Sequence, residues 1–156
     1  MSDALASYVV FKTASGNDAN VNLQNFYAEQ NRSYQGRTFA WAGFGYTGST
    51  VSLSAANTEA QLVFAVTPVT VPIMQQAYRD RWLVEVSTVW LDPDTLTETS
   101  NRLVEVYAAV GLQSDGNRLA LQLGSPLDAQ AEEIPSRVLT RKLVGQLPAT
   151  GQLSLI

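Results

Sequence analysis

The chain has 156 residues, of which 46% are apolar and 15% are charged, with a formal net charge of -4 and neither cysteine nor histidine. A domain of this length buries about 70% of the surface that its unfolded chain exposes, so a core is possible without disulfides. The absence of Cys and His excludes Ser/His/Asp and Cys/His catalytic units, iron-sulfur clusters and the usual zinc sites.

The charge and the hydropathy of the sequence exclude two further classes of protein, those that recognise nucleic acids and those that span a membrane. The acidic balance and scattered basic residues offer no footprint for a phosphate backbone, so we expect no nucleic-acid recognition. The longest apolar runs, residues 62–66 and 106–110, are far shorter than the roughly 20 residues that span a bilayer, so no membrane span is predicted.

Residues 1–4 begin no secretory signal, and synthesis in the cytoplasm without export is expected. The low charged fraction predicts a neutral polar surface or one partly covered by partners.

The N-terminal part of the chain predicts a short strand, a loop and a hairpin. Residues 8–11 suit a strand, and residues 13–30, mostly small or polar, predict a loop or an arm. Gln35-Gly36 predicts a hairpin turn within residues 31–41, because Gly tolerates positive φ. Phe39 and Trp41 then share one strand face.

Alternating apolar residues predict the next strands. Residues 50–54 and 61–66 have this period of two. Between the hairpin and these strands, residues 43–48 superficially resemble a phosphate-binding loop but lack the Lys-Ser/Thr pair, so their glycines predict a loop that turns sharply between strands.

The central part of the chain predicts a helix and then an antiparallel meander. Residues 70–80 carry apolar side chains at helical spacing near a proline, which predicts a short helix. Strands over residues 82–87 and 100–112 are joined by the Asp92-Pro93-Asp94 turn. The turn at residues 114–117 leads to a third strand, in which Leu119, Leu121 and Leu123 alternate with other residues.

These elements predict an all-β fold, an antiparallel β-sandwich or partly open barrel with one or two short helices. We expect an N-terminal strand and loop or arm (1–30), a β domain (31–133) and a C-terminal helix or extended arm (134–156). The expected core includes Trp41, Phe64, Trp82 and Leu121.

The C-terminal segment, residues 134–156, has few residues positioned to cover its apolar side chains within a small sheet domain. Such a segment either packs on its own sheet or is buried in a partner, and we favour the partner. The side chains expected at this assembly interface are Ile134, Pro135, Leu139, Leu143, Leu147, Leu153 and Ile156.

Candidate chemical groups have simpler structural interpretations. Asp92 and Asp94 could hold calcium or act as the carboxylates of a glycosidase, but turn propensity alone explains them. Glu132 and Glu133 are adjacent and would point about 100° apart on a helix, where they are most simply N-terminal charge. No enzyme activity, metal or cofactor is expected.

An aromatic cluster leaves one binding hypothesis open. Stacked aromatics can hold the face of a sugar ring, whereas large aromatics on a small sheet more often fill its core. A carbohydrate-binding module is therefore the first alternative function, and a carboxylate-dependent glycoside hydrolase is the second. The aromatics concerned are Tyr34, Phe39, Trp41, Phe44 and Tyr46.

The order of several motifs resembles a known family. The motifs are Tyr34-Gln35-Gly36-Arg37-Thr38-Phe39, Gly43-Phe44, the strand at residues 50–54, the meander, Leu121-Gln122-Leu123-Gly124-Ser125-Pro126-Leu127-Asp128 and Ile134-Pro135-Ser136-Arg137. Together they resemble the N-terminal domain of the bacteriophage minor tail protein L family, over roughly residues 28–147. That family sits at the tail tip of long-tailed phages and related gene transfer agents.

The resemblance implies a non-enzymatic structural protein of the virion, made in the host cytoplasm. It would link the distal end of the tail tube to the central hub or fibre complex of the tail tip or baseplate. The implied partners are the distal tail ring, the hub or fibre protein and the tape measure protein, together with a homo-oligomeric ring for which the family's symmetry suggests a trimer. The family's cysteine-rich C-terminal domain and its iron-sulfur cluster cannot be carried over, because this sequence has no cysteine.

Overall fold

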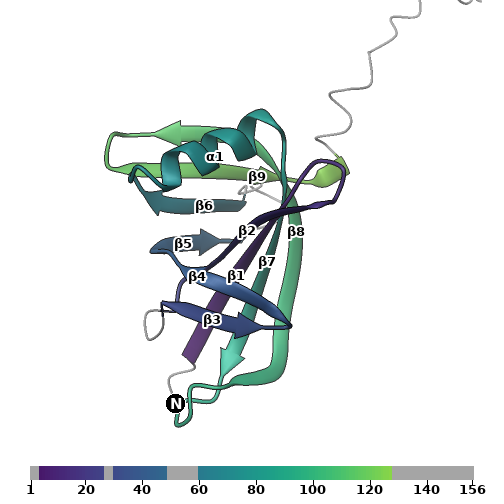
Figure 1. Cartoon of the computed structure of the whole chain (residues 1–156), viewed down its shortest axis with the longest axis vertical. Coiled ribbons are helices and arrows are strands. Elements are labelled where there is room, and N and C mark those ends of the chain that lie inside the picture. The colour runs from purple at the N-terminus through teal and green to yellow at the C-terminus, as the bar shows by residue number, and fades with distance from the viewer. Residues whose placement is uncertain (1–3, 27–29, 49–59, 128–156) are drawn as a thin grey trace, which may run out of the picture.

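The computed structural model describes residues 4–26, 30–48 and 60–127, which form one mixed sheet of nine strands and one helix (Figure 1). The strand order is β3-β4-β2-β1-β7-β8-β9-β6-β5. Every neighbouring pair is antiparallel except β2 and β4, and the sheet is not closed. This arrangement confirms the predicted all-β class, a sandwich or open barrel.

The first two strands form a hairpin. β1 (Ala4–Lys12) contains the predicted strand and extends it at both ends. The loop predicted over residues 13–30 is wrong in its centre, because β2 (Asp18–Gln24) pairs with β1 along most of its length. In β2 every second side chain is apolar and packs on the core, so pairing and burial override the poor strand propensity of its Asn and Asp residues.

The predicted hairpin at residues 31–41 is confirmed. β3 (Asn31–Tyr34) and β4 (Arg37–Trp41) pair in antiparallel register. The turn between them has φ of 50° at Gln35 and 75° at Gly36. Two successive positive φ angles are the signature of the type I′ turn, whose twist matches that of paired strands.

The next strand corrects the prediction for residues 43–48. β5 (Phe44–Thr47) is a strand that pairs with β6 (Ala60–Ala65), where a sharply turning loop was predicted. Phe44 is buried against the Phe64 ring, with centroids 5.4 Å apart, and this contact holds a segment otherwise rich in glycine. The β6 prediction is confirmed, while the strand predicted at residues 50–54 lies outside the described residues.

The predicted helix and meander are confirmed. α1 (Thr70–Arg79) precedes β7 (Leu83–Leu91), β8 (Glu98–Ser114) and β9 (Arg118–Gly124), which pair in sequence. Within the described ranges no helix is long and apolar enough to cross a membrane. At the β7–β8 turn, the Asp92 carboxylate Oδ1 accepts hydrogen bonds from the backbone N–H groups of Asp94 and Thr95, at 2.9 and 3.0 Å.

β8 joins the two halves of the sheet. Its first part pairs with β7, its last part pairs with β9, and a bulge interrupts the second ladder between Ala109 and Gly111. Figure 1 shows β8 running the length of the molecule to the half that carries α1. A bulge bends and twists a strand, so β8 can pair with both β7 and β9 although these two strands run in different directions.

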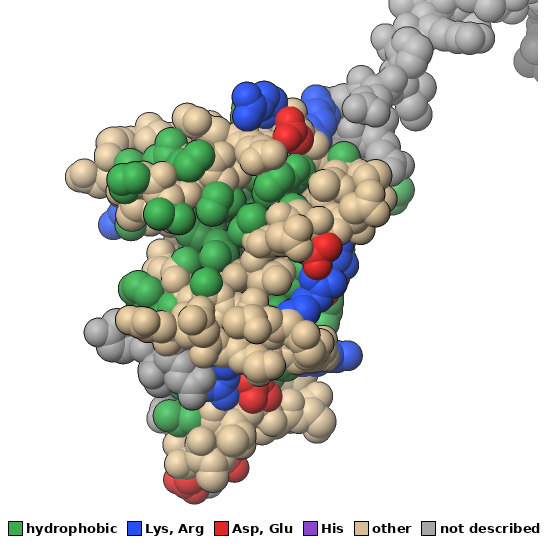
Figure 2. All heavy atoms as spheres, viewed as in Figure 1, with side chains coloured by type: hydrophobic (Ala, Val, Ile, Leu, Met, Phe, Trp, Pro, Cys, Tyr) green, Lys and Arg blue, Asp and Glu red, His purple; other side chains and the backbone are tan. Residues whose placement is uncertain are grey.

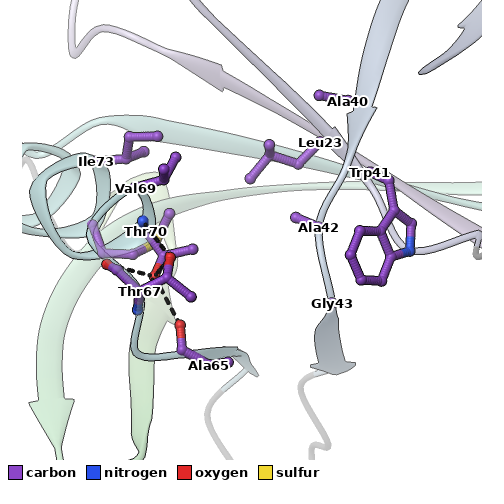
Figure 3. Close-up of a pocket in the computed structure, with 11 residues that line it drawn as sticks. Leu23, Ala40, Trp41, Ala42, Gly43, Ala65, Thr67, Val69, Thr70 and Ile73 are labelled. Atoms are coloured by element: carbon purple, nitrogen blue, oxygen red, sulfur yellow. Dashed lines mark hydrogen bonds between the residues drawn. The ribbon is translucent and has the colours of Figure 1, made fainter. Parts of the chain in front are cut away.

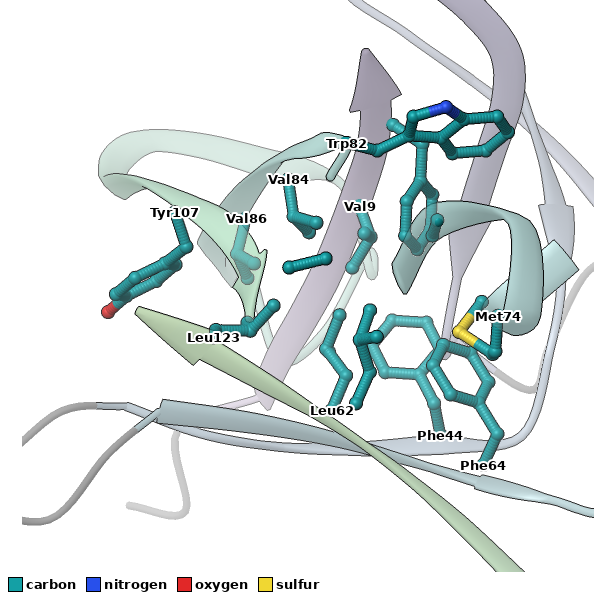
Figure 4. Packing of buried hydrophobic residues seen from close by; sticks show 14 of the residues in the cluster. Val9, Phe44, Leu62, Phe64, Met74, Trp82, Val84, Val86, Tyr107 and Leu123 are labelled. Carbon is teal, nitrogen blue, oxygen red and sulfur yellow. The ribbon is translucent and has the colours of Figure 1, made fainter. Parts of the chain in front are cut away.

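The larger core lies between α1 and the sheet (Figure 4). Phe64, Trp82 and Leu121 are buried there as predicted, at 1%, 6% and 0% exposure. Trp41 is not, because 43% of its surface is exposed. Phe39 and Trp41 share a strand face, but Trp41 stands at the end of β4, beyond the residues that cover Phe39.

A smaller core lies on the opposite face of β1 and β7. Tyr8 stacks on Tyr34 with ring centroids 4.3 Å apart, and both rings lie near Phe39. Glu98 accepts hydrogen bonds from the Tyr8 hydroxyl and the Arg32 Nε, both at 2.6 Å. The hydrogen bond from Arg32 lowers the pKa of Glu98 to about 2, so this carboxylate is charged at neutral pH and ties β3 to the start of β8.

Truncating Trp82 tests the larger core. Trp82 packs edge-on against Phe11, with centroids 6.1 Å apart, so Trp82→Ala should lower the free energy of unfolding by about 3–5 kcal/mol. Trp41→Ala is the matched control and should lower it by less than about 1 kcal/mol, because the indole is half exposed. Urea unfolding followed by circular dichroism measures both, and equal losses would contradict the burial assigned to the two side chains.

Candidate functional site

A short connection brings the two ends of the sheet together. β4 is second in the strand order and β5 is last, yet only Ala42 and Gly43 separate them in sequence. In a flat sheet these strands would lie about 34 Å apart, at roughly 4.8 Å for each neighbouring pair. The connection from Trp41 to Phe44 spans at most about 11 Å. The sheet therefore curls until its ends meet.

The ends meet without pairing. The Ala42 N–H donates a hydrogen bond of 2.8 Å to the Gln24 carbonyl, which keeps the connection on β2. β5 instead pairs with β6, so no described ladder joins β4 to β5. What remains between the two ends is an apolar cavity of about 400 Å³, here called the slot, lined by Leu23, Ala40, Trp41, Ala42, Gly43, Ala65, Thr67, Val69, Thr70, Ile73 and Met74.

One wall of the slot comes from β2, β4 and the connection. Ala40 and Ala42 point towards Leu23 and the helix, whereas the Trp41 indole lies on the other side of the backbone, alongside Gly43 (Figure 3). This alternation is the period of two of an extended chain. Because methyl groups occupy the positions that face the slot, this wall leaves space that larger side chains would fill.

The other wall comes from α1 and the residues before it. Met74 is fully buried at the base, whereas Val69 is 68% exposed at the mouth. The Thr67 and Thr70 hydroxyls are 2.9 Å apart, each accepts a hydrogen bond from the other's backbone N–H, and Thr70 also donates one to the Ala65 carbonyl. These hydroxyls are occupied within the protein, so the slot offers apolar contact with few hydrogen-bonding groups.

The surface around the slot has the same character. Figure 2 shows apolar side chains gathered in the hollow between the half of the molecule that carries α1 and the half that carries β3 and β4. The Lys, Arg, Asp and Glu side chains visible in that view lie around the margins of this area. A contiguous exposed apolar area bordered by polar groups is typical of a binding surface.

Several of the described carboxylates are held in turns or in an ion pair. Asp92 and Asp115 each accept hydrogen bonds from backbone N–H groups in a turn, and these bonds lower the pKa of both carboxyls. The turn interpretation of Asp92 and Asp94 is thus confirmed. Glu85 pairs with Lys12 at 2.7 Å, and none of these carboxylates lines the slot.

The aromatics considered for sugar binding do not form one platform. Phe39 and Phe44 are buried, and Tyr34 stacks on Tyr8 in the smaller core. Tyr46 donates a hydrogen bond of 2.7 Å to Glu105, and burial raises the pKa of its phenol. The exposed member is Trp41 at the slot.

The interface predicted in the C-terminal segment, Ile134 to Ile156, lies outside the described residues, as do Glu132 and Glu133. Sequence reasoning missed the slot. Ala40 and Ala42 carry no chemical signal, and Val69 and Ile73 are ordinary residues of a helix and its approach. The one usable clue was the two-residue interval between Trp41 and Phe44, which becomes informative only once the strand order is known.

No protein-family model matches the chain, and no match was found among curated proteins. The apolar lining of the slot suits binding of an apolar group.

Filling the slot tests whether it binds apolar molecules. Ala40 is exposed on the slot wall, so Ala40→Leu should fit without disturbing the core while occupying part of the cavity. Fluorescence of the apolar dye anilinonaphthalene sulfonate should fall on this substitution relative to wild type. Leu5→Ser, which removes an exposed apolar side chain of the internal strand β1 outside the slot, is the control and should leave most of the signal. Equal dye binding by wild type and Ala40→Leu would show that the slot is not the dye site.

Proposed function

We propose that this protein is a structural component of a bacteriophage tail tip or baseplate hub, which links the distal end of the tail tube to the central hub or fibre complex. Its action is assembly by surface complementarity and not catalysis. The observation that carries the proposal is the slot, an apolar cavity whose Thr hydroxyls are already hydrogen-bonded internally. The order of motifs that resembles the tail protein L family supplies the biological setting.

In this proposal the slot receives an apolar side chain or short segment from a neighbouring tail protein. Val69 and Ile73 would contact it from one wall, and Ala40 and Ala42 from the other. Burial of apolar surface contributes about 25 cal/mol for each Å² to the free energy of binding. Insertion of one apolar side chain or short segment into the slot would therefore stabilise a larger interface around it. The neighbours proposed are the distal tail ring, the hub or fibre protein and the tape measure protein, with residues 134–156 as a second contact.

The low charge content supports an assembly role. Charged residues make up 15% of the chain, against about 25% in an average soluble domain. Interface cores are depleted of charged side chains because their desolvation is costly. A surface with few charges can therefore be covered by several neighbours at a smaller penalty, and this would favour a homo-oligomeric ring.

A carbohydrate-binding module is the competing function. The half-exposed Trp41 favours it, because an exposed indole can stack on a sugar ring. The slot argues against it, since a sugar also needs several free hydrogen-bonding groups and those of Thr67 and Thr70 are occupied. The slot therefore fits an inserted apolar protein side chain better than it fits a sugar.

Mutating the slot mouth in the producing phage tests the proposal. Val69→Asp should fold normally, because Val69 is 68% exposed, but should place a charge where the partner's apolar group would lie. We expect the variant to be missing from purified particles and infectivity to fall. Leu5→Asp, a similarly exposed apolar position outside the slot, is the control and should be incorporated normally.

Two results would contradict the proposal. Deletion of the gene could leave intact, infectious tails, which would exclude a structural role in the tail tip. Alternatively, the purified protein could show a sugar-dependent increase in melting temperature that Trp41→Ala abolishes, which would favour the carbohydrate-binding module.

A further inference from the structure

A second pocket lies where α1 ends, whereas the slot lies against the first half of this helix. The pocket has a volume of about 360 Å³ and is lined by Tyr78, Arg79, Arg81 and Val110. It is here called the basic pocket, because two of its four lining residues are arginines, while no charged residue lines the slot. The planar fork of a guanidinium group matches the two oxygens of a carboxylate, so the basic pocket suits an acidic partner.

Arg81 occupies a backbone position that normally belongs to glycine. The Trp82 N–H donates a hydrogen bond of 2.9 Å to the Ala77 carbonyl. The Arg81 N–H donates one of 3.3 Å to the Tyr78 carbonyl. This pair of bonds is the Schellman motif that ends many helices, in which the residue with positive φ is usually Gly. Arg81 has a φ of 48°, which is less favourable for arginine than for glycine, so its presence here points to a role for the side chain.

Arg79 can reach the same partner. It lies in the last turn of α1, and its side chain is 75% exposed. Its Nε lies 3.8 Å from the Asp80 carboxylate, a distance too long for a hydrogen bond, so this contact leaves Arg79 able to donate to a closer carboxylate. Two arginines and one aspartate give residues 79–81 a net charge of +1.

The chain leaves the sheet beside the basic pocket. Gly124, the last residue of β9, lies so close to Val110 that a Cβ built on it would come within 2.9 Å of a Val110 methyl carbon. The Ser125 hydroxyl then accepts a hydrogen bond of 3.3 Å from the Leu127 N–H, at the end of the molecule that carries α1 (Figure 1). Asp128 follows Gly124 by four residues, which span at most about 14 Å. The residues after 127 therefore start within reach of the pocket.

We propose that residues 128–133 of this chain bind the basic pocket, with their carboxylates paired with Arg79 and Arg81. This segment lies outside the described residues and contains three acidic residues and no basic one, so its charge is opposite to that of the pocket. Only residues 125–127 connect it to β9, and so short a connection gives it a high effective concentration at the pocket. This proximity favours the chain's own segment over a separate acidic molecule. The carboxylates concerned are Asp128, Glu132 and Glu133.

This anchor is independent of the proposed tail function. The basic pocket and the slot share no residue. Anchoring residues 128–133 fixes the point from which residues 134–156 leave the domain, whatever those residues contact. A protein that is absent from phage tails could still hold this anchor, and loss of the anchor would leave the slot unchanged.

Proteolysis of the full chain tests the anchor first. A glutamate-specific protease should cut after Glu132 and Glu133 slowly while they are bound in the pocket. Arg79→Gln combined with Arg81→Gly removes both guanidinium groups, and the fold should be retained because glycine suits the positive φ at position 81. We expect these cuts, followed by mass spectrometry, to become about five-fold faster, as for the loss of two exposed ion pairs. Arg102→Gln, which removes an exposed arginine outside the basic pocket, is the control and should leave the rate unchanged.

Disulfide trapping then identifies the occupant of the pocket. The chain has no cysteine, so Tyr78→Cys at the pocket and Ala131→Cys in the segment introduce the only two thiols. Mild oxidation should join them within one chain, at monomer mass. The yield should fall several-fold when Arg79→Gln and Arg81→Gly are added. Salt at about 1 M should have the same effect, because it screens exposed ion pairs.

Three results would overturn the proposal. Cleavage after Glu132 and Glu133 could be as slow in the double arginine variant as in wild type, which would show that the arginines do not hold the segment. Equal acceleration by Arg102→Gln would show a general effect of charge and not a specific pocket. A disulfide formed mainly between two chains would show that the occupant of the pocket is another molecule.

Discussion

The connection formed by Ala42 and Gly43 links two strands that occupy distant places in the sheet order. Because so short a connection cannot cross a flat sheet, the nine strands must curl until β4 and β5 lie at neighbouring positions. The Ala42 N–H is bonded to the Gln24 carbonyl, so the connection is fixed to β2 and does not hang free. The curvature of the sheet follows from this covalent constraint.

Curling divides the molecule into two packed regions. The concave side encloses the larger core with α1, while β3 and β4 cover the smaller core on the other face of β1 and β7. β8 is long enough to belong to both halves of the sheet, and its bulge accommodates the change of direction. The same geometry leaves an unfilled slot where the ends meet.

Local patterns predicted much of this fold from the sequence. The 31–41 hairpin, α1 and the β7-β8-β9 meander were predictable because turn chemistry and apolar periodicity act within each segment. β2 and β5 were missed because their residues have weak strand propensity and become strands only through their partners. Trp41 was wrongly assigned to the core. The alternation of apolar residues shows which face of a strand is buried, but it does not show at which residue the packing against that face ends.

The slot could not be predicted in the same way. It depends on small side chains at Ala40 and Ala42 and on the distance between the sheet ends, both of which acquire meaning only in three dimensions. Composition is informative in a different way, because the lack of cysteine and histidine excludes the catalytic units and metal sites that need those residues. The sequence therefore limited the chemistry available to the chain more tightly than the position of the slot.

Native-state hydrogen exchange at Ala42 tests the central constraint most directly. If the short connection holds the two ends of the sheet together, the Ala42 amide should exchange only in global unfolding, with the same free energy as central amides such as that of Val86. Exchange at Ala42 as fast as at the Gly116 turn, while Val86 stays protected, would mean that the ends separate readily. That result would contradict the curled sheet and the slot that depends on it.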